Sequence, residues 1–515
     1  MATLLDSLRG LVPFSKNLPD GTIEDLVGGQ RNYNWLASAF ISWINQADME
    51  RQDQYATYRN YYNGEHLYQL TDRMKEFLEL DSNVKFDLNY LPLAIDVLAE
   101  RLVVLGFSGD EKVGGREGIL SEWWLDSELD ASQDDVHLSA MRDGDTYMII
   151  GWDNGKKIPT FSHEPAYDGD YGVGVRYYND GTDKIRLAFK RWYVETGEPT
   201  QRMNIYTDSV MYKFITTSGG WDTFMDEGEA EWPIPWVDKR GEPLGVPVIH
   251  FKTKGAGAQF GKSELHDLIP AQDALNKMVL DEIAGADIEG FGLITLSGGR
   301  PPEDMDLGPR KILYAPDGTW DSIAAGDLNA LSDMVHNYIV RIAQLSRTPL
   351  QYFQSTKQIA SEDTQRAYDT GIVSKAENLS KHYGKSWDRA MRMGLQLDNV
   401  FGSGKWTDEQ RKKIRTVWGT FERVDKLQTE KNRADIAVRL VEGGSSLRGA
   451  LMIAGYSEDE IKNLLLGAPL VSPIFLKAGG TGQAQANLLS SDSEQRGMTD
   501  NAAGGDVASA TARAD

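Results

Sequence analysis

The stretch 261–349 contains two candidate helices, PAQDALNKMVLDEIAGA (270–286) and LNALSDMVHNYIVRIAQL (328–345), and it decides how the fold is interpreted. In the second segment, apolar residues recur every three or four positions, at Leu328, Leu331, Val335, Tyr338, Ile342 and Leu345. The first segment has a less regular set, at Leu268, Ala271, Leu275 and Met278 and then at Val279, Ile283 and Ala286. Both patterns predict an apolar stripe along a helix.

The residues between these two helices favour a small β structure. Segments 291–296 and 310–315 have the composition of short strands, and the intervening GGRPP (298–302) and Gly308-Pro309 are typical turn sequences. We therefore expect a stalk, in which two helices leave a body and return to it after a β tip. Most enzymes have no use for such a stalk, whereas a part that docks into an assembly does.

The composition excludes several functional classes. The chain has 515 residues, enough for several packed units, and no cysteine, which excludes disulfides, thiolate catalysis and cysteine-ligated metals. It has no apolar run long enough to span a bilayer and no secretory pattern at its start, so we expect a soluble protein that is not exported. The net charge of −23 repels free DNA and argues against a repressor or a histone-like protein. This charge fits a surface that DNA passes without adhering, or solubility alone.

Before the stalk, helices precede strands. We expect a loose arm over residues 1–30, a helix over 35–62 that ends at Asn63-Gly64, and a second helix that begins at the NYLP sequence (89–92) and ends at Gly106. Shorter helices follow near 118–127 and 132–142. From 146 to 251, runs of β-branched and aromatic residues predict an antiparallel sheet, with strands at 146–152, 158–162, 173–178, 185–194, 203–215 and 246–251.

After the stalk, Pro349 ends the second helix and a polar stretch follows, composed of Gln354, Ser355, Thr356, Lys357 and Gln358. A long helix begins at Ser361 and continues to about Leu397, with Gly371 and Gly384 as candidate bends. Residues 425–467 predict a compact unit of three helices. Beyond Lys477 the sequence is rich in Gly, Ala, Ser, Asn and Asp, and we expect disorder there.

One segment resembles a nucleotide-binding loop. AGAQFGKS (256–263) matches a Walker A loop except that Ala256 replaces the first glycine, and MVLDE (278–282) resembles a Walker B strand. In such a site Lys262 and the Ser263 hydroxyl would hold phosphate and Mg²⁺. However, Asp281 falls inside a predicted helix, and the chain lacks the βαβ series that supports a true site. We therefore interpret residues 261–264 as a turn and helix start, and keep a nucleotide hydrolase using Lys262 as an alternative.

Other chemical signals are weaker. The seven histidines show no metal-ligand spacing, no G-x-S-x-G elbow occurs, and the abundant carboxylates single out no catalytic pair such as a glycosidase needs. We predict no catalytic, cofactor-binding or metal-binding residue, no cofactor, and a protein that is not an enzyme.

A set of motifs, taken in order, resembles a known family. The motifs are YRNYYNGEH (58–66), NYLPLAIDVLAERLVVLG (89–106), AMRDGDTY (140–147), FGKSEL (260–265), IPAQDALNK (269–277) and LSRTP (345–349). Together they resemble the portal proteins of tailed bacteriophages, and more narrowly the portal family common in long-tailed phages of Gram-positive hosts. The resemblance covers about residues 33–470.

The resemblance implies an α+β, mainly helical fold with a wing, a two-helix stem, a β-containing clip and a helical crown. The implied parts are an N-terminal arm (1–30), wing (31–262), first stem helix (263–289), clip (290–326), second stem helix (327–347), tunnel loop with long wing helix (348–424), crown (425–475) and disordered tail (476–515).

It also implies a function. Portals are homo-oligomeric rings, usually dodecamers, at one capsid vertex of the virion, and they assemble in the host cytoplasm. The terminase large subunit packages double-stranded DNA through the ring, head-tail connector proteins dock later, the DNA is ejected through it, and the ring also meets major capsid and scaffold proteins. No membrane is involved. The polar stretch 354–358 corresponds to the tunnel loop, where contacts to DNA phosphates are independent of sequence. Lys357 is the best candidate for a DNA-facing cation; an ordinary exposed lysine is the alternative.

Two competing functions remain open: the nucleotide hydrolase using Lys262, and a different virion connector or scaffold protein. If the chain forms a ring, each subunit needs two different contact faces, because contacts that close by rotation are heterologous. The sequence does not identify the residues that form them.

Overall fold

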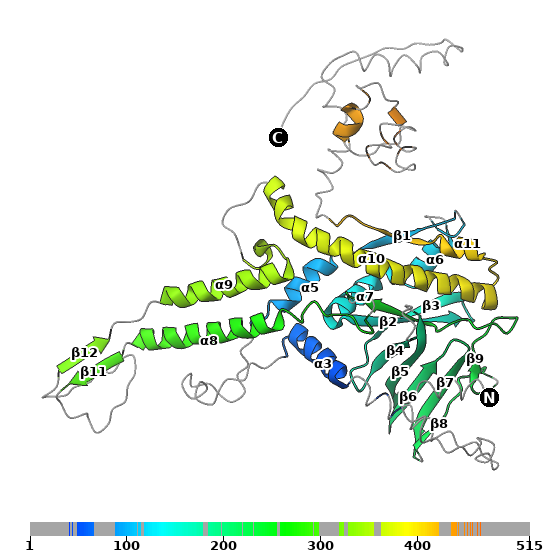
Figure 1. Ribbon diagram of the computed structural model, residues 1–515, viewed down its shortest axis with the longest axis horizontal. Coiled ribbons are helices and arrows are strands. Elements are labelled where there is room, and N and C mark those ends of the chain that lie inside the picture. Colours follow the sequence, from blue (N-terminus) through cyan, green and yellow to red (C-terminus); the bar gives the residue numbers. More distant parts are fainter. Residues whose placement is uncertain are drawn as a thin grey trace, which may run out of the picture. The chain divides into compact units, whose positions relative to one another are not determined.

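The computed structural model describes residues 41, 44, 49–65, 88–110, 112–114, 118–178, 184–196, 198–218, 220–229, 231–254, 258–291, 293–297, 319–323, 328–354, 362–421, 434–439, 441, 447–448, 451, 454, 456, 461 and 464. The chain divides into two compact units, Met1–Glu422 and Arg423–Asp515. The larger unit contains a mixed helix and strand body and a pair of long helices (Figure 1).

Two antiparallel sheets form most of the described β structure of the body. In the first, β2 (Asp145–Asp153) lies between β10 (Val248–Lys252) and β3 (Ile158–Pro165). The second has the order β4 (Gly172–Tyr177), β5 (Ile185–Thr196), β6 (Glu198–Tyr206), β7 (Val210–Thr217) and β8 (Gly220–Thr223), and β9 (Ile234–Pro235) also pairs with β7. The predicted antiparallel region is confirmed, but it divides into two sheets.

Strand β2 is buried on both faces. Tyr147 belongs to a cluster with residues of β4 and β5, whereas Met148 and Ile150 belong to the main core with Trp123 and Trp387. Successive side chains of a strand point to opposite faces, so the first sheet lies between the second sheet and a layer of helices. This layer contains α6 (Ile119–Asp126), α7 (Leu129–Asp143) and α10 (Glu362–Phe401).

Shorter elements complete the body: α3 (Met49–Asn63), α5 (Leu91–Ala99), α11 (Asp408–Lys412), and a small antiparallel sheet of β1 (Val104–Ser108) and β13 (Arg415–Trp418). The predicted helix over 89–106 is wrong at its end, because α5 stops at Ala99. Gly106, which the sequence suggested as a helix cap, has a φ of 149° at an irregularity in the pairing of β1 with β13. A glycine at positive φ fits a strand bulge as well as a helix end.

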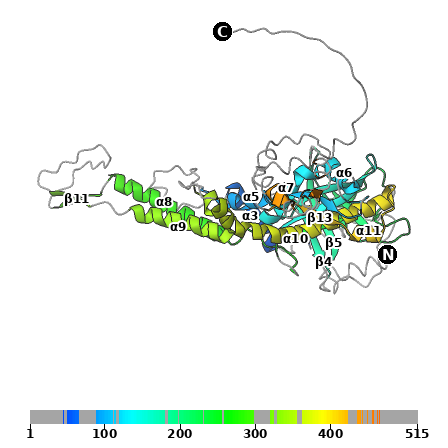
Figure 2. The same cartoon turned by 90° about the horizontal axis from the view of Figure 1, so that it is seen from above.

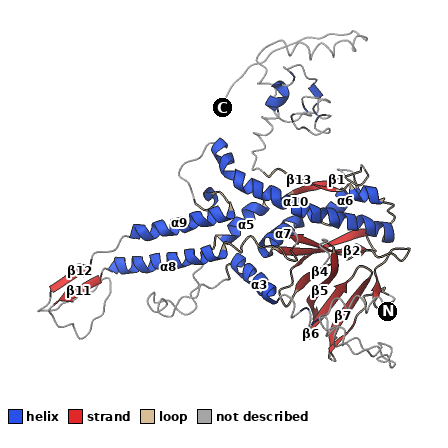
Figure 3. Cartoon of the chain, viewed as in Figure 1, coloured by secondary structure: helices blue, strands red, loops and turns tan. Residues whose placement is uncertain are grey.

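The two long helices, α8 (Ile269–Phe291) and α9 (Leu328–Ser346), run side by side, and the antiparallel strands β11 (Leu293–Ser297) and β12 (Thr319–Ile323) lie at their far end (Figures 1 and 3). We call this segment the arm. The second strand of the tip begins at Thr319, and the predicted strand over 310–315 lies outside the described residues. A short 3₁₀ helix, Leu350–Tyr352, follows α9.

Helix α10 is longer than the sequence predicts, because it continues without a break to Phe401. Gly384 has a packing role: a Cβ there would lie 3.1 Å from the Trp418 indole nitrogen, so the glycine allows β13 to approach the helix. Among the described residues, no helix has the length and apolar character required to cross a bilayer.

The smaller unit is described only in part. Residues 434–439 are helical, within the compact unit predicted over 425–467. A small apolar cluster unites residues spread over this predicted unit, namely Ala437, Leu451, Ala454, Tyr456 and Ile461. The tail beyond Lys477, for which the sequence predicts disorder, lies outside the described residues.

Candidate functional site

The stretch predicted to face DNA is described at only one residue. Gln354 follows the 3₁₀ helix, and its side-chain nitrogen lies 2.9 Å from Nδ1 of His336 on α9. Ser355, Thr356, Lys357 and Gln358 lie outside the described residues, so their position relative to DNA stays a prediction.

The loop that resembles a nucleotide-binding motif forms the entry to α8. The Lys262 ammonium lies 2.6 Å from an Asp267 carboxylate oxygen, and the buried Ser263 hydroxyl donates to the carbonyl of Arg142. A Cβ on Gly261 would lie 2.0 Å from the Gly144 carbonyl oxygen, so close backbone approach requires glycine there. Asp281 lies on α8 and faces Lys277 at 3.4 Å, inside a helix as predicted. These contacts fit a turn and helix start.

A buried charge network holds this loop to the body. The carboxylate of Asp145, the first residue of β2, accepts from Arg51 Nη2 at 2.8 Å, from the Tyr55 hydroxyl at 2.7 Å and from the Gly261 N–H at 2.6 Å. His250 Nε2 lies 2.8 Å from the same carboxylate. Burial acts to raise the pKa of Asp145, but the hydrogen bond and charge of His250 and the Arg51 guanidinium outweigh it and lower the pKa to about 2.

A second network joins α3 to the same turn. The guanidinium of Arg59 donates to Asp143 at 3.0 Å, to Asp168 at 2.6 Å and to the Ala166 carbonyl at 2.8 Å. Arg142 also donates to Asp143 at 2.7 Å. Because Asp143 is fully buried, both arginines are needed to offset the loss of its hydration.

Lys375 on α10 connects the two ends of the arm. Its ammonium lies 2.8 Å from a carboxylate oxygen of Glu264, just before α8, and donates to the carbonyl of Ser346, the last residue of α9, at 3.0 Å. Lys254 contacts the other oxygen of Glu264 at 2.7 Å. Burial acts to raise the pKa of Glu264, but the charges of Lys375 and Lys254 outweigh it and lower the pKa. A single buried ammonium therefore fixes where the arm leaves and re-enters the body.

Polar side chains also anchor the first turns of α8. Gln272 is fully buried: its carbonyl oxygen accepts from the Tyr90 N–H at 3.0 Å, and its amide donates to the Leu88 carbonyl. The Tyr61 hydroxyl donates to Asp273 at 2.8 Å. Tyr58 is buried and Tyr61 partly buried, so both also pack against the apolar core. The base of α8 is thus fixed by directional bonds, which define its position more narrowly than apolar contacts.

Apolar packing of the arm follows the predicted stripes with three corrections. Leu268 and Leu275 of the first stripe and Ile342 of the second are buried, together with Leu280, Ile339 and Ala343. Ile283 is 39% exposed, Leu345 is 55% exposed and Ala286 is also exposed, so these three belong to the outer surface of the arm. The predicted stripes are therefore wrong at these three positions.

In the part of the chain that the structure describes, no three His, Cys, Asp or Glu residues are arranged to hold a metal ion. His137 is completely buried, and burial lowers its pKa to about 3, so the ring is neutral and accepts from the Trp387 indole N–H at 3.0 Å.

The motifs that carried the resemblance gather at the base of the arm. Residues from 58–66, 89–106, 140–147, 260–265, 269–277 and 345–349 all take part in the contacts described above. The sequence did not single out Asp145 or Glu264, although both stand inside these motifs. It gave no signal for Lys375 or His250, because their partners are distant in the chain.

Comparisons with known proteins support the resemblance that the motifs suggest. The sequence model of the family described as "Phage portal protein, SPP1 Gp6-like" matches residues 41–287, which include Asp145, Glu264 and most of α8. The chain is 25% identical over 389 residues to the portal protein of Mycobacterium phage D29, which covers 70% of this chain and 73% of that protein. It is likewise 25% identical over 401 residues to the portal protein of Mycobacterium phage L5, covering 72% of this chain and 76% of that protein. The resemblance to the portal proteins of tailed phages that the sequence motifs predicted is therefore confirmed.

Proposed function

We propose that this protein forms the ring-shaped channel at one vertex of a phage capsid, through which double-stranded DNA enters during packaging and leaves during ejection. The observation that supports this most directly is the arm, two antiparallel helices with a β tip, whose two ends Lys375 joins at one buried point. An element fixed at its base and presented away from it suits a channel wall, because it must keep its place while DNA moves past.

We propose that the parts of the chain correspond to the parts of a portal subunit. Residues 31–262, with α10, act as the wing; α8 and α9 act as the stem, over 263–289 and 327–347; and residues 290–326, which include β11 and β12, act as the clip. Residues 425–475 act as the crown. The polar stretch 354–358 acts as the tunnel loop, with Lys357 toward DNA phosphates. The portal identity of the relatives supports this assignment.

The proposed partners follow from these parts. The clip docks the terminase large subunit during packaging and head-tail connector proteins afterwards, while the wing meets major capsid and scaffold proteins in the host cytoplasm before the virion is complete. The ring is most simply a dodecamer. The net charge of −23 favours passage of DNA without tight binding, because a strongly cationic channel would retain the phosphates.

Sedimentation velocity combined with negative-stain electron microscopy of the purified full chain tests the proposal. We expect one large species whose end views are closed rings with a central hole. Monomers or dimers at every protein and salt concentration would overturn the ring. Open filaments or small closed oligomers without a hole would instead favour a connector or scaffold protein.

A further inference from the structure

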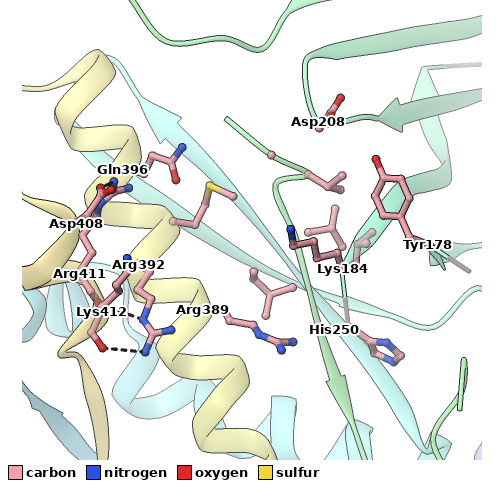
Figure 4. Close-up of a pocket in the computed structure, with 16 residues that line it drawn as sticks. Tyr178, Lys184, Asp208, His250, Arg389, Arg392, Gln396, Asp408, Arg411 and Lys412 are labelled. Carbon is pink, nitrogen blue, oxygen red and sulfur yellow. Dashed lines mark hydrogen bonds and ion pairs between the residues drawn. The ribbon is translucent and has the colours of Figure 1, made fainter. Parts of the chain in front are cut away.

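The exposed face of α10 carries a row of cations. Lys381, Lys385 and Arg389 are spaced four residues apart, which places them along one side of the helix. All three line a pocket of about 580 Å³, and Arg389 also lines an adjoining pocket of about 700 Å³ (Figure 4); the two pockets share Arg389 and Arg392. Eight basic residues line this pair of pockets, which we call the cationic groove: Lys184, Lys381, Lys385, Arg389, Arg392, Arg411, Lys412 and Arg415. Only three carboxylates line it, although acidic residues outnumber basic ones in the whole chain.

Most of the positive charge in the cationic groove is not paired with a carboxylate that lines the groove. Of the three carboxylates, Asp388 is buried, accepts from Thr416 and pairs with Arg392 at 3.6 Å and with Arg415 at 3.9 Å. Asp408 pairs with Arg411, so three of the eight cations have a carboxylate partner in the groove. Lys385 and Arg389 are exposed and form no hydrogen bond or ion pair with any residue that the structure describes. The pKa of the neighbouring His382 is lowered, first by burial and then by the charges of Lys385, Lys252 and Lys381. The groove is therefore a local positive field on an acidic protein.

A complementary surface lies on α6 and α7, which we call the acidic face. Six exposed carboxylates cluster there without a lysine or arginine anywhere in residues 119–141: Glu122, Asp126, Glu128, Asp130, Asp134 and Asp135. None forms an ion pair within the described residues. Leu125, between them in sequence, is 59% exposed. The apolar side chains Ile185 and Met393 line the groove, so each surface combines charge with an apolar contact.

The two surfaces lie on opposite sides of one core. Trp387 of α10 packs edge-on against Trp124 of α6 at 5.1 Å and donates to His137 of α7. Lys385 and Arg389 each lie two residues from Trp387, so they point away from this contact. Figure 2 shows α6 and α7 along one side of the body and α10 and α11 along the other. One copy therefore cannot bring its own two surfaces together.

We propose that the cationic groove of one subunit receives the acidic face of the next subunit in the ring. This inference rests on the proposed function, because it supplies the two different faces that a closed heterologous ring requires. Charge complementarity selects a second copy of this chain as the occupant, since the chain itself presents a matching surface on the opposite side. Such charges also fix the register of neighbours and suppress wrong pairings.

Two charge-reversal variants of the full chain test this. K385E/R389E replaces two cations of the groove by carboxylates, and D126K/D135K replaces two carboxylates of the acidic face by lysines. Each variant then places like charges opposite one another at the substituted positions of every contact, and we expect assembly to require at least about tenfold higher protein concentration than in the wild type. Sedimentation velocity gives the assembled fraction, and circular dichroism checks that each variant is folded.

The decisive sample is an equimolar mixture of the two variants. In the mixture every contact between unlike subunits is complementary again, and we expect rings to return, as they should in the variant that carries all four substitutions. Loss of assembly without rescue in the mixture would overturn the proposal, even if both variants are folded. Rings that persist in each variant alone would also overturn it, and weaker retention of DNA by such K385E/R389E rings would assign the groove to a polyanion.

A matched control separates the interface from net charge. K239E/R240E changes one exposed lysine and one exposed arginine in a turn outside the groove, and it should assemble as the wild type does. If the wild type itself forms no rings, the proposed function fails. If the wild type forms rings that the two groove and face variants also form, only the interface inference fails.

Discussion

At the scale of single residues, Lys375 joins the two ends of the arm to the body. Its ammonium contacts Glu264 before α8 and the Ser346 carbonyl at the end of α9. Removing one partner of a buried ion pair leaves the other charge without compensation, which costs more than the pair itself contributes. The same reasoning applies to Asp145, where four donors meet one buried carboxylate.

The substitution K375M tests this role. We expect it to lower the free energy of unfolding by about 3 kcal/mol, because Glu264 would keep only the partly exposed Lys254 as a cationic partner. The matched control K381M changes an exposed lysine of the same helix and should alter stability by less than about 0.5 kcal/mol. Urea unfolding followed by tryptophan fluorescence measures both. Equal effects of the two substitutions would show that the buried contacts of Lys375 contribute no more to the free energy of unfolding than an exposed lysine does.

The Asp145 network predicts a dependence of stability on pH. The pKa of this carboxyl is about 2 in the folded protein and 3.8 in its ordinary state, so the ionised form stabilises the fold above about pH 4. That contribution, about 2 kcal/mol, disappears as the pH falls from about 4 toward 2. D145N should therefore be less stable than the wild type at pH 7, and its stability should depend less on pH below 4. Parallel acid-unfolding curves for the two proteins would contradict this prediction.

Lys262 allows a test of the alternative hydrolase. Its ammonium is paired with Asp267 and the neighbouring Ser263 hydroxyl is bound to Arg142, so neither is placed to hold phosphate. We expect no nucleotide turnover by the purified wild type, and normal ring assembly by K262A. Turnover by the wild type that K262A abolishes would instead support the hydrolase.

At the scale of elements, the arm shows where local sequence patterns suffice. Helix α9 follows from its apolar spacing, but Leu345, one residue before the end of the helix, is exposed on the outer surface. Strand β1 could not be predicted from residues 104–108 alone, since its partner β13 is about 300 residues away. Gly106 looks the same in sequence whether it ends a helix or forms a bulge.

The corrected α9 stripe predicts different losses of stability when the apolar side chains of Ile342 and Leu345 are each truncated to alanine. I342A removes a fully buried side chain and should destabilise the protein by about 3 kcal/mol, through lost transfer energy and the cavity left behind. L345A, its control on the exposed surface, should cost less than about 1 kcal/mol in the isolated subunit. Thermal unfolding of both variants compares them. A larger cost for L345A would mean that the register of α9 against the body is wrong.

At the scale of the whole molecule, the sequence predicted the stalk, the antiparallel β region and the family, because each depends on local periodicity or on ordered motifs. The sequence could not predict the contacts that fix the base of the arm to the body. Asp145 and His250 are 105 residues apart, and Glu264 and Lys375 meet only once α10 lies against the entry of α8. Contacts of this kind are set by tertiary packing, which leaves no pattern in the neighbouring residues.

The central claim is that the arm, fixed at its base by Lys375, lines the channel of a ring. An electron cryo-microscopy reconstruction of the assembled full chain tests it most directly. We predict a closed ring in which α8 and α9 of every subunit lie next to the central hole, with α10 of one subunit facing α6 and α7 of the next. A ring whose arms lie on its outer rim, away from the hole, would contradict the account.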